Sequence, residues 1–207
     1  MARFVLIHGA WHGSWCFAEL ADALSVLGHE VDAPDLPCDQ VGLTVPDYAR
    51  LVGPQLDAVV VGHSFGAQVA ALVAARRHVF LAGLLPVADP RSECFVPEFG
   101  GLVRDELGRS YWPDPDTCAE KMYPDCTREQ SDWAFPLLRP QAPVDTIEPR
   151  LSTDDVVIAT TRDRCIDGAW QLRTGQAYGA RVVELDAGHS PFFTQPEELA
   201  RLLDAFA

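Results

Sequence analysis

The sequence predicts an α/β protein with a mostly parallel sheet of about six strands flanked by helices. Three observations support this fold class. Apolar runs of strand length alternate with segments of helical spacing, the pattern of a parallel sheet with helical crossovers. The β-branched run Ala58–Val61 suits a strand that is covered on both faces, as parallel strands are. The chain has 207 residues, enough for one domain with a sizeable core.

The strands are predicted from short apolar runs, and the helices from apolar residues at helical spacing. The expected strands are Phe4–His8, Glu30–Ala33, Ala58–Val61, Val79–Leu85, Val156–Thr161 and Arg181–Leu185. The expected helices are Trp15–Leu27, Pro46–Leu56, Gly66–Arg77, Ile166–Tyr178 and Pro196–Phe206. Gly28 is expected to end the first helix, and Pro46 suits the first turn of the second.

The pattern changes between Val87 and Pro149, where prolines, acidic residues and aromatics are frequent and no long strand pattern is present. We expect this segment to form a compact lid that is inserted after the fourth predicted strand. It should cover the carboxyl edge of the sheet, where open α/β sheets bind ligands. The expected organisation is a core of residues 1–87 and 151–207 with a lid of residues 88–150, called the insertion below.

The charge and the apolar stretches exclude several classes of protein. With 30 acidic and 16 basic residues the net charge is −14, which argues against nucleic acid and against anionic membranes as partners. The longest apolar stretches, Val79–Ala88 and Ala67–Ala75, are far shorter than the ~20 residues that a membrane span needs. The first apolar run, Phe4–Ile7, is shorter than that of a signal peptide, so we expect a cytoplasmic protein.

The six cysteines have irregular spacing and form no CxxC pair. A chain of this size does not depend on disulfides, so we expect free thiols. Cys118 and Cys126 are the pair that would form in an oxidising compartment.

The strongest chemical signal is the pentapeptide Gly62-His63-Ser64-Phe65-Gly66. It lies between a predicted buried strand and a predicted Ala-rich helix, which is the context of a nucleophile elbow. Glycines flank Ser64 because side chains there would clash in so tight a turn. The following helix N-terminus favours a developing oxyanion. We therefore predict that Ser64 is a nucleophile rather than only a helix cap.

A serine nucleophile needs a base, and His189 is the best candidate among the six histidines. It follows the last predicted strand, and the triad order on such a sheet is serine, acid, histidine. His63 adjoins the nucleophile, but its side chain should point away from Ser64. The remaining histidines are less suited, because they lie in the first loop (His8, His12) or before strands at the opposite edge (His29, His78).

The acid should follow a strand between Ser64 and His189. Asp163 comes directly after the strand that ends near Thr161, and is the favoured candidate. Asp89 is a rival, and Asp167 is a second one that is better placed to begin a helix. The acid would hold the imidazole in the productive tautomer and stabilise the imidazolium.

The loop after the first strand, His8–Trp15, is the third part of the predicted site. Acyl transfer needs two backbone N–H groups directed at the oxyanion. We assign one to Phe65, the residue after the nucleophile, and the other to Ala10 in this loop. The alternative is that the loop is merely a flexible turn between strand and helix.

Aromatic side chains are frequent near the predicted site and in the insertion. They favour an apolar small molecule as ligand, although any one of them could instead pack the insertion onto the sheet. The residues expected to bind substrate are Trp11, Phe95, Trp112, Trp133 and Phe192. Arg104, Arg109 and Arg128 are interpreted as solvated surface charges.

Four segments together resemble α/β-hydrolases of the branch that holds plant methylesterases, hydroxynitrile lyases and bacterial pyrethroid-type esterases. They are FVLIHGAWHGSW, VGHSFG, TRDRCIDGAWQ and DAGHSPFFTQPEEL, and the resemblance covers nearly the whole chain outside the insertion. It implies the α/β-hydrolase fold, with Ser64 as nucleophile, Asp163 as acid, His189 as base and the Ala10 and Phe65 amides as oxyanion hole. Such relatives are usually some tens of residues longer.

The resemblance also bears on the reaction. Hydroxynitrile lyases typically have Thr where this chain has Gly9, and Lys where it has Ser190, so ester hydrolysis is favoured. We expect a cofactor-independent serine hydrolase that cleaves a carboxylic ester, or a lactone or thioester, of an apolar small molecule through an acyl-enzyme. The alternatives are a lyase or cyclase that uses the same residues, and a non-catalytic small-molecule receptor.

Neither a metal nor an organic cofactor is expected. No group of His, Cys and Asp shows the spacing of metal ligands, and His8–Gly13 matches neither a dinucleotide-binding motif nor a P-loop. The expected partner is a small-molecule ester.

Overall fold

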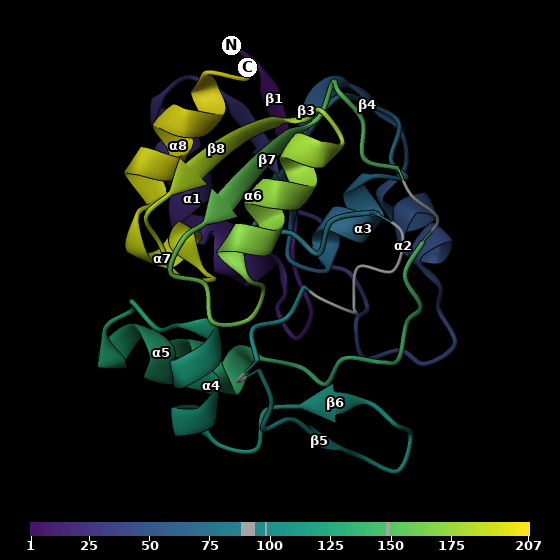
Figure 1. Cartoon of the computed structure of the whole chain (residues 1–207), viewed down its shortest axis with the longest axis vertical. Coiled ribbons are helices and arrows are strands. Elements are labelled where there is room, and N and C mark those ends of the chain that lie inside the picture. The colour runs from purple at the N-terminus through teal and green to yellow at the C-terminus, as the bar shows by residue number, and fades with distance from the viewer. Residues whose placement is uncertain (88–93, 98, 148–149) are drawn as a thin grey trace.

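A six-stranded sheet forms the centre of the computed structural model, which describes residues 1–87, 94–97, 99–147 and 150–207 (Figure 1). The strand order is β2-β1-β3-β4-β7-β8, and every neighbouring pair is parallel. The strands are β1 (Arg3–Ile7), β2 (Glu30–Asp32), β3 (Gln55–His63), β4 (Ala75–Leu81), β7 (Val156–Thr160) and β8 (Arg181–Leu185). The predicted fold class is confirmed, and so is the number of strands in the sheet.

Helices cover both faces of the sheet, as the apolar composition of its central strands requires. They are α1 (Ala18–Val26), α2 (Val45–Val52), α3 (Gly66–Ala70), α6 (Gly168–Ala177), α7 (Pro191–Thr194) and α8 (Pro196–Asp204). Helices α1 and α8 pack on each other, whereas α6 packs on β7 and β8, and α3 on β3 (Figure 1). All five residues of β7 are buried as a result.

The first two helices differ from their predicted bounds in ways that the backbone explains. The first begins as a 3-10 turn (Ser14–Phe17) before α1, and Gly28 with φ +85° follows its end as expected. The second, α2, begins after a capping box on Thr44 and ends at Val52. Gly53 has φ +72° and breaks the helix, so the predicted end at Leu56 is wrong.

The predicted helix Gly66–Arg77 is wrong in its second half. Helix α3 ends at Ala70, and β4 already begins at Ala75. Ala75 pairs with Gln55, and Arg77 pairs with Val59. Sheet pairing thus provides hydrogen-bond partners for the backbone of residues that the Ala-rich composition predicted to be helical.

The fourth strand also ends earlier than the predicted Val79–Leu85. It stops at Leu81, because Ala82 has φ +45° and the chain turns there. The turn is fixed by the Ala82 amide, which donates to the Ile158 carbonyl (3.0 Å).

The described part of the insertion lies at the carboxyl ends of the strands (Figure 1). It contains a small antiparallel pair, β5 (Val103–Arg104) and β6 (Ser110–Tyr111), two helices, α4 (Pro115–Met122) and α5 (Arg128–Ala134), and a 3-10 turn (Phe135–Leu137). The chain termini lie at the opposite end of the sheet (Figure 1). The division into core and lid stays a prediction, because its boundaries fall on or beside residues 88–93 and 148–149, outside the described residues.

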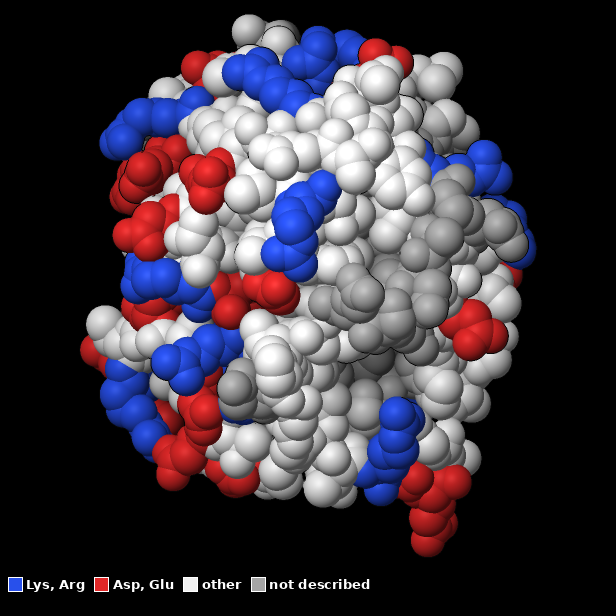
Figure 2. All heavy atoms as spheres, in the orientation of Figure 1, with Lys and Arg blue, Asp and Glu red and all other residues white. Residues whose placement is uncertain are grey.

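Three further features bear on the partners and the location expected from the sequence: the surface charge, the length of the helices and the state of two cysteines. On the face drawn in Figure 2, the described Lys and Arg residues are interspersed with Asp and Glu and form no continuous basic patch. Within the described ranges, no helix combines the length and the apolar composition needed to cross a bilayer. Cys118 and Cys126 carry free thiols in this structure.

Candidate active site

The turn between β3 and α3 gives Ser64 an unusual backbone conformation. Ser64 has φ +52°, in the left-handed region that non-glycine residues rarely adopt. Its own amide donates to the Leu81 carbonyl (3.1 Å), and its carbonyl accepts from the Leu84 amide (3.0 Å). These bonds hold the strained turn in place.

The glycines on either side of Ser64 are required by close backbone contacts. A Cβ at Gly62 would lie 2.5 Å from the Gly66 carbonyl oxygen. A Cβ at Gly66 would lie 2.4 Å from the Ile7 carbonyl oxygen. The turn therefore packs directly against the end of β1, which raises Ser64 above the carboxyl edge of the sheet.

His189 and Asp163 come together from the loops after β8 and β7. The imidazole Nδ1 and the carboxylate Oδ2 are 2.8 Å apart, and both side chains are almost completely buried. With Nδ1–H donating to the carboxylate, Nε2 is the unprotonated nitrogen of the neutral ring. Asp167 instead caps α6 through its bond to the Ala169 amide (3.0 Å), and Asp89 lies outside the described residues.

Asp163 is itself held by a set of donors. Its Oδ1 accepts from the backbone amides of Cys165 (2.7 Å) and Ile166 (3.0 Å). The Thr160 hydroxyl donates to Oδ2 (2.9 Å), on the same oxygen that faces His189. The orientation of the carboxylate is thus fixed by the chain around it.

The first loop packs against Ser64. A Cβ on Gly9 would lie 2.8 Å from the Ser64 Cβ, so only glycine permits this approach. His8 anchors the loop, because its Nε2 accepts from the Leu36 amide (2.9 Å) and its Nδ1–H donates to the Gly9 carbonyl (2.9 Å). Ala10 and Phe65 both line the cavity that contains Ser64.

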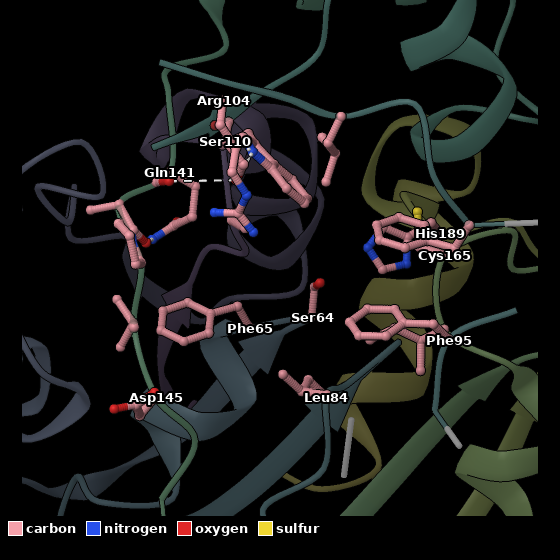
Figure 3. Close-up of a pocket in the computed structure, with 18 residues that line it drawn as sticks. Ser64, Phe65, Leu84, Phe95, Arg104, Ser110, Gln141, Asp145, Cys165 and His189 are labelled. Carbon is pink, nitrogen blue, oxygen red and sulfur yellow. Dashed lines mark hydrogen bonds between the residues drawn. The ribbon is translucent and has the colours of Figure 1, made fainter. Parts of the chain in front are cut away.

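That cavity has a volume of about 340 Å³ and opens above the elbow (Figure 3). Ser64 lies between Phe65 and His189 in the view, and its hydroxyl points into the open space. Apolar groups from the core and from the insertion make up most of the wall, while Arg104, Gln141 and Asp145 add polar groups (Figure 3). The segment 141–145 has no motif that would have marked it as part of a cavity.

The five aromatic residues expected to bind substrate have different positions. Trp11 and Phe95 line the cavity. Trp112 is buried behind Trp11, with ring centroids 5.4 Å apart. Phe192 is fully buried against the ring of His63, and Trp133 is 52% exposed and packs against Trp15 and Phe193. Among the described residues, the lining of the cavity thus includes two of the five, and Phe99 and Leu102 in addition.

Comparison with known proteins identifies the family of the chain. Residues 4–202 match the family described as "Alpha/beta hydrolase family". The chain belongs to this family.

The hydrolase has both plant and bacterial relatives. It is 26% identical to methylesterase 10 of Arabidopsis thaliana over 252 aligned positions, which cover 99% of this chain and 91% of the relative. It is 28% identical to a carbendazim hydrolyzing esterase of a Nocardioides species, covering 99% of each chain. Its fold matches the crystal structure of a pyrethroid hydrolase from Sphingobium faniae JZ-2 with a TM-score of 0.77 and 20% identity, covering 99% of this chain and 96% of the other. The resemblance to methylesterases and pyrethroid-type esterases is confirmed.

Two more imidazoles of the hydrolase lie buried beside His189. The His63 ring is turned into the protein, where its Nε2–H donates to the His189 carbonyl (2.9 Å). The His12 Nε2 lies 2.9 Å from the Tyr123 hydroxyl, and its ring packs against that of His63. Burial lowers the pKa of His12 to about 3 and, with the nearby His189, holds the pKa of His63 well below its usual range. Both rings are therefore neutral at pH 7.

These low values predict an acid-sensitive fold. Below pH ~6.5 the unfolded chain protonates His12 while the folded chain does not, so folding loses stability as the pH falls toward about 3. Between pH 7 and pH 5 one such histidine costs about 2 kcal/mol of unfolding free energy. We expect His12→Gln, which cannot titrate, to lose about 2 kcal/mol less than the wild type over this range, as measured by urea unfolding. Equal losses in the two proteins would contradict this assignment.

One group of potential metal ligands coincides with the hydrolase site. Atoms of Asp163, Cys165 and His189 lie within 4.8 Å of one another. The imidazole and the carboxylate are already hydrogen-bonded to each other, and burial raises the pKa of the Cys165 thiol well above its usual range. A metal would have to break that hydrogen bond and remove the thiol proton, so this arrangement fits an acid–base pair better than a metal centre.

Proposed function

We propose that the protein is a serine esterase that cleaves a carboxylic ester of an apolar small molecule through an acyl-enzyme. One observation carries the proposal. Ser64, on a strained elbow, shares a cavity with His189, and the other nitrogen of that imidazole is hydrogen-bonded to the buried carboxylate of Asp163. Related methylesterases and a carbendazim hydrolyzing esterase support the same class of reaction.

In the proposed reaction, the Ser64 hydroxyl attacks the ester carbonyl carbon while His189 Nε2 takes the hydroxyl proton. The Ala10 and Phe65 amides stabilise the negative oxygen of the tetrahedral intermediate. The imidazolium then gives its proton to the leaving alkoxide, which departs as an alcohol. Water then attacks the acyl-enzyme while His189 takes its proton, the bond to the Ser64 oxygen breaks, and the imidazolium returns the proton to that oxygen as the acid is released. Each step uses only groups of the chain and water.

The cavity supports a small and largely apolar acyl or alcohol group. A volume of about 340 Å³ is at the lower end of the range for small-molecule sites. Phe65, Phe95 and Phe99 offer ring surface to such a group. A lactone or thioester of the same size presents the same carbonyl to Ser64.

Cyanohydrin cleavage on the same residues is less well supported. The lyases that resemble this chain have Thr at position 9, whereas a Cβ at Gly9 would lie 2.8 Å from the Ser64 Cβ and 2.9 Å from the His63 Nδ1. Position 190 is a buried serine and supplies no cation to hold a cyanide leaving group.

We also propose that the enzyme acts in the cytoplasm. Free thiols at Cys118 and Cys126 fit a reducing compartment.

Covalent labelling tests the proposed function. A fluorophosphonate should add one phosphonyl group to the wild-type protein, detected by intact mass, with the adduct on the peptide that contains Ser64. Ser64→Ala should remain unlabelled and should not hydrolyse p-nitrophenyl acetate above background, because the nucleophile is gone.

Three outcomes separate the candidate functions. A wild-type protein without an adduct would contradict the esterase. Labelling without turnover of any ester in a panel would favour a lyase or cyclase. Ligand-dependent capture of a partner that persists in Ser64→Ala would favour a receptor.

A further inference from the structure

Asp125 lies between α4 and α5 of the insertion, and its carboxylate reaches the loop that carries His189. Its Oδ2 accepts a hydrogen bond from the Gly188 amide (2.7 Å), directly before the histidine. The Thr194 hydroxyl, beyond the histidine at the end of α7, lies 3.5 Å from the same oxygen. The side chain is only 8% exposed, and Arg162 lies 3.7 Å from it. The insertion thus supplies an acceptor to the backbone beside His189.

The fit between Asp125 and this backbone is tight. A Cβ on Gly188 would lie 2.4 Å from Asp125 Oδ1, so the carboxylate occupies the space that any other residue would need. A short bond between an amide and a carboxylate is of the stronger, charge-assisted kind. Glycine at 188 and aspartate at 125 are therefore complementary.

A second contact holds the other side of the same peptide segment. The His189 carbonyl accepts from the Nε2–H of His63 (2.9 Å), which lies on the elbow strand. The backbone around His189 is thus held from the insertion on one side and from β3 on the other. The bond to Asp163 orients the ring of His189, whereas these two contacts fix the position of the backbone that carries the ring.

We propose that Asp125 is a positioning residue, which holds the base His189 in register with Ser64 through the Gly188 amide. The inference rests on the proposed function of His189. Its consequence is that the segment forming one wall of the substrate cavity also sets the position of the base. A base displaced by about 1 Å costs on the order of 100-fold in rate, so the contact should act on kcat rather than on KM.

Three variants test this role with p-nitrophenyl acetate as substrate. Asp125→Ala removes the acceptor and should lower kcat by about 10- to 100-fold with KM changed less than about threefold. Asp125→Asn keeps a carbonyl oxygen that can accept from Gly188, and should restore most of kcat. Asp116→Ala is the matched control, because Asp116 is an exposed aspartate of the same insertion whose partner is Arg128, and it should stay within about twofold of wild type.

The outcomes distinguish this inference from the proposed function. If Asp125→Ala keeps the kcat of Asp116→Ala, or if Asn is as impaired as Ala, the positioning role is wrong. If Asp125→Ala does not fold, as judged by its thermal transition, Gly188→Ala tests the same contact from the other side, and a wild-type kcat there would overturn the role. If wild-type turnover does not depend on Ser64, the proposed function fails whatever the Asp125 variants do.

Discussion

Replacing Asp163 by Asn is expected to lower kcat by about 10³- to 10⁴-fold while the protein stays folded. The reason lies in the donors around the carboxylate. Two backbone amides, of Cys165 and Ile166, donate to Oδ1, so an asparagine would keep its carbonyl oxygen there. Its NH₂ group would then face His189 Nδ1 and would hold the imidazole with the proton on Nε2. In this tautomer the ring cannot accept the proton of Ser64.

Steady-state turnover of p-nitrophenyl acetate measures this effect, and Asp167→Asn is the matched control. Asp167 belongs to the same loop but caps α6, a position where asparagine serves as well as aspartate. Its turnover should stay within about twofold of wild type. Asp89→Asn is the second comparison, because the sequence offers Asp89 as an alternative candidate for the catalytic acid. A larger loss at either position than at Asp163 would contradict the assignment of the acid.

Replacing Gly66 by Ala is expected to destabilise the fold by about 3 kcal/mol or more. The added Cβ would lie 2.4 Å from the Ile7 carbonyl oxygen and 2.7 Å from that of His8. Both are backbone atoms at the end of β1, so no flexible side chain can move aside. In the variant either β1 or α3 would have to shift, and this shift would strain the pairing between β1 and β3.

Urea unfolding measures this loss. Gly100→Ala is the control for the effect of replacing glycine by alanine where no clash is expected. Among the described residues, none has an atom within 4 Å of a Cβ added at Gly100. Gly100→Ala should therefore change the unfolding free energy by less than about 0.5 kcal/mol. If the unfolding free energy of Gly66→Ala equals that of Gly100→Ala, the backbone at the elbow accommodates the added Cβ without strain, and the prediction is wrong.

The sequence predicted the elements whose signals are local. Buried strands such as Val156–Thr160 appear as uninterrupted apolar runs, and Arg181–Leu185 is predicted to the residue. The end of α3 could not be predicted in this way. Residues 71–77 favour a helix by composition, and only the pairing of β4 with β3 decides against it. Such pairing is a long-range property that no window of sequence contains.

The same distinction holds for the site. Ser64, Asp163 and His189 each follow a strand end, and a rule about strand ends is enough to find them. The cavity wall is different, since Gln141 and Asp145 reach it from a segment without regular structure. Trp133 and Phe192 could not be separated from Trp11 by residue type, because an aromatic ring suits a cavity wall and a packed core equally well.

The order of the strands has a consequence for folding. Ser64, the proposed nucleophile, follows β3 inside the block β2-β1-β3-β4 that is formed by the first part of the chain, whereas Asp163 and His189, the proposed acid and base, follow β7 and β8. The pairing of Val79 with Val156 must close a loop that contains the whole insertion, and such non-local contacts form slowly. During refolding, native-like spectroscopic signals from the first block should thus return before esterase activity does, because the active site is completed by the last strands to dock.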